Sequence, residues 1–475
     1  MWLEKLFVYA VCVLCVGHVY GQDVAVKVDL CDKDALYACR CDEEAKLGTD
    51  SFVIDVECSF RNLTVLTNDM LLPQFTDSLD LSMNQLIEIT HKEILISSTM
   101  TVLLLGRNKI QKIAAGSFVD LPNLLELDLS ENEITSIESE VFHGIYKLRY
   151  LHLSTNKLQT LAEHAFQNLP KLYMLGLDHN NLGEFLEKQD DMFSTGGLAI
   201  NPSIAHLHLG YTNFSNIPFK HFRSAYNLRM LSLAGNRITA LPQIPFTLEA
   251  LDISDTSISS LSPKDFADLP AMKELFLNDL QNLTEIANHT FHPLKSLIKI
   301  ELQNCKNLRL FSPFAFGVNA ADLDNEEYEF PVLDINLMGS GLRTLDERLL
   351  PLFSRLTNLD IRSNPWNCDC KLKWLLQLQV KESDREYISC NRPPDLQGRQ
   401  LWSLPASAMD CKTWSITISG VTRVALVLLC IALAALALWL VMLWPPQSQT
   451  LPLRTVGPDS PYSRITIQPN RPDDL

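Results

Sequence analysis

The sequence predicts a repeat solenoid, a horseshoe of stacked coils with a parallel β-sheet on its concave face and a mostly irregular convex side. Three observations predict it. Within 124–185 one phrase recurs three times, and its asparagine returns every 24 residues. Cysteines gather on both sides of the regular part, four at 31–58 and four at 368–411. A run of 20 residues without a charge, 424–443, predicts one transmembrane helix after the coils.

The recurring phrase reads LLELDLSENEITSI, LRYLHLSTNKLQTL and LYMLGLDHNNLGEF, starting at Leu124, Leu148 and Leu172. Alternate leucines of each strand point inward, and no copy can bury them alone, so the copies must stack. The asparagine in the ninth position can hydrogen-bond backbone groups of the next coil. These letters resemble the leucine-rich repeat, and the resemblance implies an α/β-type horseshoe of about twelve repeats over 75–364.

Most copies hold a hydrogen-bonding side chain in the ninth position. The ninth-position residues are Asn84, Asn108, Asn132, Asn156, Asn180, Thr212, Asn236, Thr256, Leu280, Cys305, Ser340 and Asn364. Leu280 cannot hydrogen-bond, so its coil must satisfy its backbone in another way, for example through Asn282 turned inward. Cys305 is expected to be a small buried thiol rather than a reactive cysteine. Ten residues further on, a recurring phenylalanine should form a second apolar spine under the convex side. These phenylalanines are Phe118, Phe142, Phe166, Phe222 and Phe266.

Residues 1–21 are expected to be a secretory signal peptide, because a short apolar run follows a basic residue and ends before small residues. The run is too short to span a membrane comfortably. Secretion into an oxidising compartment favours disulfides over a zinc site for the four cysteines of the next segment, 22–74.

The cysteine-bearing ends resemble the caps of extracellular leucine-rich repeat proteins. The letters CRC…FVIDVECSFRNLTVL resemble the N-terminal cap. The letters NPWNCDCKLKWL…CNRPPDLQGRQLWSLPASAMDC, which fill 365–411, resemble the C-terminal cap. Caps would cover the apolar ends that a stack of coils otherwise exposes. The resemblance implies the pairs Cys31–Cys41, Cys39–Cys58, Cys368–Cys390 and Cys370–Cys411.

Residues 424–444 are expected to form the transmembrane helix, after a juxtamembrane linker at 412–423. A lipid-anchor signal is the alternative, but such signals end at the apolar tail, and here 31 residues follow. The signal peptide places the coils outside the cell, which makes this a type I single-pass protein of the plasma membrane. Cys430, Ala434 and Ala437 form a small-residue stripe that can pair two helices, so a homodimer is one partner hypothesis.

The tail, 445–475, is rich in proline and polar residues and is expected to be disordered on the cytoplasmic side. It has no kinase pattern and is too short for a Toll/interleukin-1-receptor signalling domain. The letters from Tyr462 to Ile465 resemble the tyrosine-based sorting signal that adaptor complexes read in extended form. A cytoplasmic adaptor is therefore a further partner hypothesis.

Two copies carry insertions, because 32 residues separate Asn180 from Thr212 and 35 separate Cys305 from Ser340. The first insertion contains two glycines and a proline and is expected to be a surface loop. The second insertion is acidic. Insertions in solenoids form loops that can bind a partner, and the alternative is a longer connection between coils without a binding role.

No triad order, phosphate loop, paired-carboxylate signature or metal motif stands out, so neither an enzyme nor a cofactor or metal site is predicted. Function is then expected in the variable third and fifth positions of each strand, which face the concave side. The candidate ligand-binding residues are Tyr150, His152, Met174, His206, His208, Met230 and Phe276. Aromatic, Met and His side chains with acidic neighbours suit a protein-binding patch, although scattered exposed residues are an ordinary alternative.

Two of these residues, His206 and His208, share a face but lack a third ligand in the sequence, so a metal ion is not predicted there. A pH-sensitive contact through His152, His206 and His208 is the stronger hypothesis. Four N-x-S/T sequons suit a secreted surface, and the second of them should be exposed. They begin at Asn62, Asn213, Asn282 and Asn288.

The chain is acidic, with 40 Lys+Arg against 56 Asp+Glu, and it contains no basic run, so nucleic acid is not expected as a partner. The whole pattern resembles cell-surface adhesion and guidance receptors, including insect receptors of this class without immunoglobulin modules. The resemblance implies binding of an extracellular protein. Two alternatives stay open. One is an innate immune receptor or co-receptor that captures a microbial or cytokine-like ligand, and the other is a regulator of an extracellular enzyme.

Overall fold

The computed structural model divides into two units, Met1–Cys411 and Lys412–Leu475. It describes residues 28–32, 38–45, 52–68, 70–91, 95–189, 191–193, 198–218, 220–318, 330–411 and 420–443. Four predicted features therefore lie outside the described residues. They are the signal peptide, the acidic insertion up to residue 329, most of the juxtamembrane linker, and the tail with Tyr462 and Ile465.

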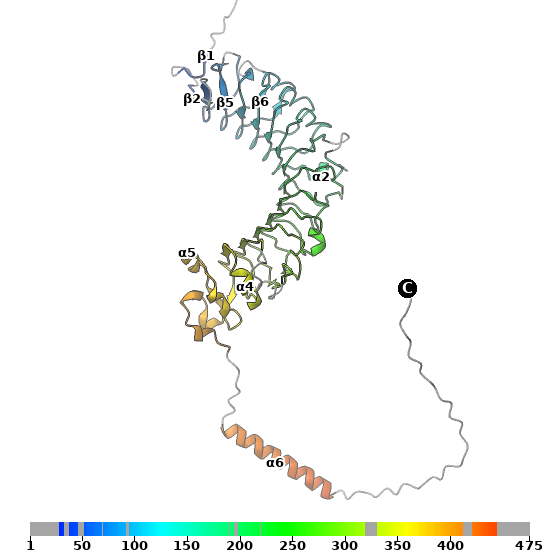
Figure 1. Cartoon of the computed structure of the whole chain (residues 1–475), viewed down its shortest axis with the longest axis vertical. Helices are drawn as coiled ribbons and strands as arrows, with labels where there is room; N and C mark the ends of the chain where they lie inside the picture. The colour runs from blue at the N-terminus through cyan, green and yellow to red at the C-terminus, as the bar shows by residue number, and fades with distance from the viewer. Residues whose placement is uncertain are drawn as a thin grey trace, which may run out of the picture. The chain divides into compact units, whose positions relative to one another are not determined.

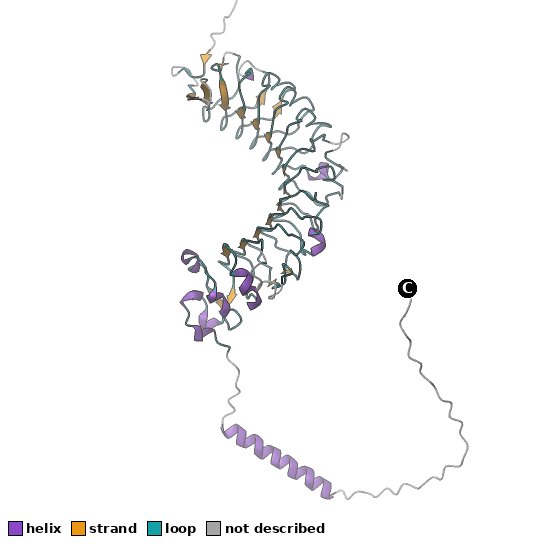
Figure 2. Cartoon of the chain, in the orientation of Figure 1, coloured by secondary structure: helices purple, strands orange, loops and turns teal. Residues whose placement is uncertain are grey.

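Over the described residues, the first unit is a solenoid of about 13 turns built on one 14-stranded sheet. An antiparallel hairpin, β2 (Arg40–Ala45) and β3 (Phe52–Glu57), starts the sheet, and twelve parallel strands follow it. They are β5 (Thr76–Asp80), β7 (Val102–Leu104), β9 (Glu126–Asp128), β10 (Tyr150–His152), β11 (Met174–Gly176), β12 (His206–His208), β13 (Met230–Ser232), β14 (Ala250–Asp252), β15 (Glu274–Phe276), β17 (Lys299–Glu301), β19 (Asp334–Asn336) and β20 (Asn358–Asp360). Figures 1 and 2 show these strands along the inner edge of a curved stack.

Outside this sheet, the described part of the first unit is mostly irregular, as predicted for the convex side, with short parallel pairs and short helical segments in the coils and caps. The pairs are β1 (Val28–Asp29) with β4 (Met70–Leu71), β6 (Glu88–Ile89) with β8 (Lys112–Ile113), β16 (Glu285–Ile286) with β18 (Leu310–Phe311), and β21 (Trp366–Asn367) with β22 (Cys390–Arg392). The helical segments are α2 (Gly183–Leu186), η3 (Pro263–Phe266), η4 (Glu347–Leu349), α4 (Leu350–Phe353), η5 (Lys373–Gln377), α5 (Glu382–Arg385), η6 (Pro394–Leu396), η7 (Leu401–Ser403) and η8 (Ala406–Met409).

The core has two layers. In the first, Leu127, Leu151 and Leu175 lie in register on neighbouring strands and are fully buried. In the second, the predicted phenylalanine spine is confirmed, because all five rings are buried and Phe142 stacks on Phe166 with ring centres 6.1 Å apart. Each coil therefore buries its apolar side chains only against its neighbours, as stacking requires.

The ninth-position asparagines form a buried column of hydrogen bonds. Asn132 Nδ2 donates to the carbonyl of Leu105 in the preceding coil (3.0 Å) and to that of Leu129 in its own coil (3.2 Å). Its Oδ1 accepts from the backbone amide of Ile110 at 3.0 Å. The predicted role is confirmed, but the bonded neighbour is the preceding coil and not the next one.

The other ninth-position residues bond less fully. The Thr256 hydroxyl donates to Ile253 in its own coil, and the Cys305 thiol donates to Leu277 in the preceding coil. Burial raises the pKa of Cys305 to about 12, so its thiol stays protonated, in line with the predicted structural role. Leu280 is fully buried without a polar atom. The expectation that Asn282 turns inward to compensate was wrong, because its side chain is exposed and donates to the Ser257 carbonyl.

For the described residues of the first insertion, the prediction of a surface loop was wrong. After α2, they bury Met192, Phe193, Leu198 and Ile200 in the core. In the sequence these apolar residues stand beside the glycines and the proline that indicated a loop, so turn residues alone do not predict exposure here. The insertion thus adds a layer of core to the coil that contains it.

His221 is fully buried beside this insertion. Its Nδ1–H donates to the Gln189 carbonyl at 2.9 Å, while its Nε2 has no hydrogen-bond partner among the described residues. Its ring packs edge-on against Phe214 and Phe222. Burial lowers the pKa of His221 below its ordinary value, and the Gln189 carbonyl and Asp191 oppose that shift. The neutral ring is therefore part of the folded state.

Lowering the pH should consequently destabilise this region. The unfolded chain takes up a proton at His221 near the ordinary pKa of about 6.5, whereas the folded chain takes it up only at lower pH. Stability from this group is complete above that value and is lost as the pH falls from about 7 towards 5, by at most about 1.4 kcal/mol per pH unit. Urea unfolding at both pH values should show a smaller loss for His221→Phe than for the wild type. An equal loss in both proteins would contradict the assignment.

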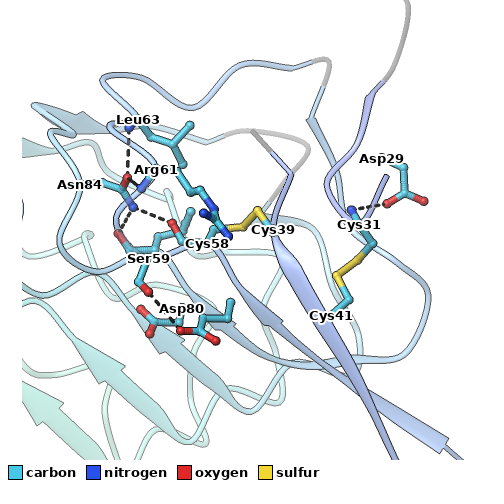
Figure 3. The surroundings of a disulfide bond; sticks show 12 residues. Asp29, Cys31, Cys39, Cys41, Cys58, Ser59, Arg61, Leu63, Asp80 and Asn84 are labelled. Atoms are coloured by element: carbon cyan, nitrogen blue, oxygen red, sulfur yellow. Dashed lines mark hydrogen bonds between the residues drawn. A yellow bond between two sulfur atoms is a disulfide. The ribbon is translucent and has the colours of Figure 1, made fainter. Parts of the chain in front are cut away.

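Two disulfides, Cys31–Cys41 and Cys39–Cys58, close the N-terminal end (Figure 3). Asn84 joins this end to the coils, since its Nδ2 donates to the Cys58 carbonyl at 2.9 Å. At the C-terminal end the disulfides join Cys368 to Cys390 and Cys370 to Cys411. The four pairs are the ones that the resemblance implies.

The C-terminal cap is built around two tryptophans. Trp366 and Trp374 are buried, and their indole N–H groups donate to the carbonyls of Ile361 and Leu345, each at 3.2 Å. Both carbonyls belong to the last coils, so the cap covers the end of the apolar core.

The second unit contains α6 (Gly420–Leu443), which includes all but the last residue of the predicted transmembrane segment. Its described side chains, at 424–440 and 442–443, are exposed. Within the part of the chain that the structure describes, no helix combines the length and the apolar character that a membrane crossing requires.

Candidate functional site

The candidate residues occupy two rows of the concave sheet. The third-position row brings Tyr150, Met174, His206 and Met230 together on four adjoining strands. The fifth-position row runs His152, Gly176, His208 and Ser232 across the same strands. The side chains of the six candidate residues on these strands are partly exposed, as expected for a face that is open to a partner. They form one continuous surface on β10 to β13.

An arginine and a tyrosine that the sequence analysis did not select complete this surface. Arg149 and Tyr173 each precede a third-position residue, so they lie at the side of the sheet. The Arg149 guanidinium lies over both the Tyr150 ring (5.8 Å) and the Tyr173 ring (5.5 Å). The two tyrosine rings meet edge to face at 5.9 Å, and Tyr173 lies 5.0 Å from the His206 ring. These contacts order the aromatic rings around one cation.

The histidines of the surface have different surroundings. His152 Nε2 lies 3.8 Å from a carboxylate oxygen of Glu126 on β9. His206 is partly buried, and burial together with nearby His208 and Arg229 lowers its pKa below the ordinary value, while Glu249 opposes the shift. At neutral pH the neutral form of His206 is therefore favoured, so its ring offers aromatic contact and hydrogen bonding rather than charge.

Phe276 does not belong to the same cluster. It lies on β15, and β14 separates it from β13. The Lys299 ammonium lies 5.2 Å from the Phe276 ring and pairs with Glu301 at 2.7 Å. On the side of the sheet between the two regions, Glu249 pairs with Arg229 (3.0 Å) and Lys273 (2.7 Å). The structure thus places Phe276 in a separate charged region of the concave face.

No group of three or more His, Cys, Asp or Glu side chains in the described ranges is arranged to hold a metal ion. His206 and His208 lie on β12 with one residue between them, and their neighbours are Met174 and Gly176 on β11 and Met230 and Ser232 on β13. Uncharged neighbours of this kind suit contact with a partner surface.

The four sequons lie away from the strands of the concave sheet. All four asparagines are exposed, including Asn213, for which exposure was predicted. They lie in the connections that follow each strand, and Asn62 and Asn213 have positive φ. The four sequons therefore lie outside the third- and fifth-position rows.

The fold and the repeats define the class, and the comparisons with known proteins agree with it. The family described as leucine rich repeat matches residues 98–158, 126–182, 226–281 and 246–306. The chain therefore contains leucine-rich repeats, with disulfide-bonded cysteines at both ends of the stack.

Several curated proteins are similar to parts of the chain. Tsukushi of Gallus gallus is 28% identical over 161 residues, which cover 34% of this chain and 41% of Tsukushi. The leucine-rich repeat transmembrane protein FLRT2 of Rattus norvegicus is 25% identical over 244 residues, covering 46% and 36%. The CD180 antigen of Mus musculus is 25% identical over 230 residues, covering 41% and 33%. The chain thus spans less than half the length of these relatives.

The chain also resembles solved structures, and for two of them the likeness is of the fold alone. The mouse RP105/MD-1 complex aligns with a TM-score of 0.49 and 22% identity, covering 74% of this chain and 53% of that chain. The octameric complex of latrophilin 3, Unc5D and FLRT2 aligns with a TM-score of 0.48 and 20% identity, covering 78% and 97%.

Proposed function

We propose that this chain is a non-enzymatic cell-surface receptor or adhesion protein that binds an extracellular protein through the concave face of its coils. The observation that supports this most strongly is the continuous surface on β10 to β13, where tyrosine, methionine and histidine side chains lie side by side. Clustered aromatic residues and methionine, with arginine at the edge, have the composition of energetically important protein contacts. The placement of the sequons away from this surface also supports the proposal.

Attachment to the plasma membrane is part of the same proposal. The 20 residues of 424–443 contain no charge, and that length matches the thickness of a bilayer. One relative, FLRT2, is also named a transmembrane protein. With the coils outside the cell, the tail would reach the cytoplasm, where Tyr462 and Ile465 would serve sorting by an adaptor.

The concave face is tested with the full chain on living cells, fused to a proximity-labelling enzyme on the extracellular side. The double variant Tyr150→Ala with Phe276→Ala should lose labelling of its extracellular partners by about tenfold or more, because large ring contacts dominate such interfaces. Tyr226→Ala removes an exposed ring (59% exposed) outside the sheet and should leave labelling unchanged. Equal surface expression of all three proteins controls for folding. Unchanged labelling by the double variant would overturn the concave-face assignment.

A cell-aggregation assay separates adhesion from capture of a soluble ligand. Cells that display the full chain should cluster, with each other or with cells that carry the partner, if adhesion is its role. Cells that label a partner but never cluster would instead support ligand capture.

A further inference from the structure

We infer that the partner presents a short segment with an acidic and aromatic centre between basic residues. This inference rests on the proposed function and names the chemistry of the partner. It comes from the charge pattern of the concave face, which changes sign twice along the stack. The central strip comprises the third and fifth positions of β10 to β13 together with the second position, which is the residue just before each strand.

The central strip carries cations and rings but no carboxylate. Its side chains are those of Arg149, Tyr150, His152, Tyr173, Met174, Ala205, His206, His208, Arg229, Met230 and Ser232, with Gly176 between two histidines. The whole chain has a formal net charge of −16, so a strip of this composition stands out from its surroundings. An anionic group of a partner would meet favourable charge in this strip.

Arg149 is the cation best placed to receive that group. Among the described residues it forms no ion pair, and its guanidinium contacts only the rings of Tyr150 and Tyr173. Arg229, in contrast, already pairs with Glu249. A guanidinium held between two rings keeps its N–H donors available at the edges, where a carboxylate can bind with two hydrogen bonds.

Gly176 lies between His152 and His208 in the fifth-position row and is buried. A Cβ atom there would lie 2.9 Å from the Ser154 hydroxyl, so that hydroxyl already occupies the space beside the glycine. An aromatic ring of the partner would instead stack on the partly exposed rings of Tyr150, Tyr173 and His206.

Acidic residues border the strip at both ends. Glu126 and Asp128 lie on β9 and Asp252 lies on β14, whereas Glu249 beside β14 is already paired with Arg229 and Lys273. At about 4.8 Å per strand, these borders are about 24 Å apart. A long polyanion such as a sulfated polysaccharide would run over both borders and be repelled there. A protein segment with basic ends would be attracted to both borders.

Two peptides of equal composition test the pattern, with full-length protein in detergent micelles and fluorescence anisotropy as the readout. The first is Lys-Lys-Ser-Glu-Tyr-Glu-Ser-Lys-Lys, and the second, Glu-Lys-Ser-Lys-Tyr-Lys-Ser-Lys-Glu, moves the carboxylates to the ends. The first should bind about tenfold more tightly or better, because only its acidic centre meets Arg149. Absence of binding, or equal binding of the two peptides, would overturn the inference.

Variants locate the effect. Arg149→Gln should abolish the difference between the peptides, and Arg149→Lys should keep only part of it, because an ammonium lacks the planar fork. Lys147→Gln removes one positive charge two residues away, at a side chain bonded to Asn123, and should preserve the difference. Unchanged thermal melting shows that each variant is folded. If Arg149→Gln keeps the full difference, the assignment to Arg149 is wrong.

Heparin tests whether the central strip also binds an extended polyanion. Binding of heparin that is as tight as that of the first peptide and is lost in Arg149→Gln would show that the strip accepts extended polyanions, against this inference. The proximity-labelling experiment on Tyr150 and Phe276 distinguishes a failure of the proposed function from a failure of this inference. Failure there removes the concave face as the interface, whereas failure of the peptides alone removes only the proposed chemistry of the partner.

Discussion

Replacing Asn132 with Ala should lower the free energy of unfolding by roughly 2–4 kcal/mol. The Asn132 side chain is buried, and its loss would leave the Ile110 amide unpaired and remove a donor from the carbonyls of Leu105, Leu129 and Ser130, which keep other donors. Each buried polar group left unpaired costs about 1–3 kcal/mol. Urea unfolding followed by circular dichroism measures the change.

Asn123→Ala is the matched control. Asn123 is partly exposed, and the bonds of its side chain, to the Ser98 carbonyl and the Lys147 ammonium, lie at the surface. Its removal should change stability by less than about 0.5 kcal/mol. If the two alanine variants unfold at the same urea concentration, the buried column does not stabilise the stack as described.

Replacing Phe142 with Ala should cost about 3–5 kcal/mol, because a fully buried ring is removed and the surrounding coils cannot collapse around the cavity. Phe142 stacks on Phe166 of the next coil, so the loss falls on an interface between coils as well as on one coil. Tyr146→Ala, at a ring that is 45% exposed, should cost much less. Thermal unfolding of both variants provides the comparison. Similar melting temperatures would contradict the claim that the buried phenylalanine rings stabilise the stack.

The residues that stack the coils could be predicted because every coil must bury the same apolar positions and satisfy the same backbone groups. Leu127, Asn132 and Phe142 each perform a task that recurs at the same interval, so periodicity alone identifies them. The insertion after Asn180 has no such repetition. Its glycines indicated a loop, and only the structure shows that Met192 and its apolar neighbours return to the core.

The candidate site was predicted in part. Alternation along a strand predicts that Tyr150 and His206 face the concave side. The register of the sheet places both next to Met174 on the strand between them. Arg149 and Tyr173 were missed because they precede the strand, where alternation no longer describes direction. A recurring cation or ring just before the third position is the signal that could have identified them. His221 could not have been found, since its burial depends on the insertion that covers it.

The column of ninth-position side chains has a further consequence for how the molecule comes apart. Thr256 bonds only within its own coil, and Leu280 makes no side-chain bond at all, so within the described stack the turn that carries β14 lacks this link to either neighbour. Each coil is stabilised only by its interfaces with the adjacent coils. A cooperative unfolding unit therefore ends at the interface with the smallest stabilising free energy. Fraying there would divide the molecule into an N-terminal and a C-terminal block, each still sealed at its outer end by its own disulfides.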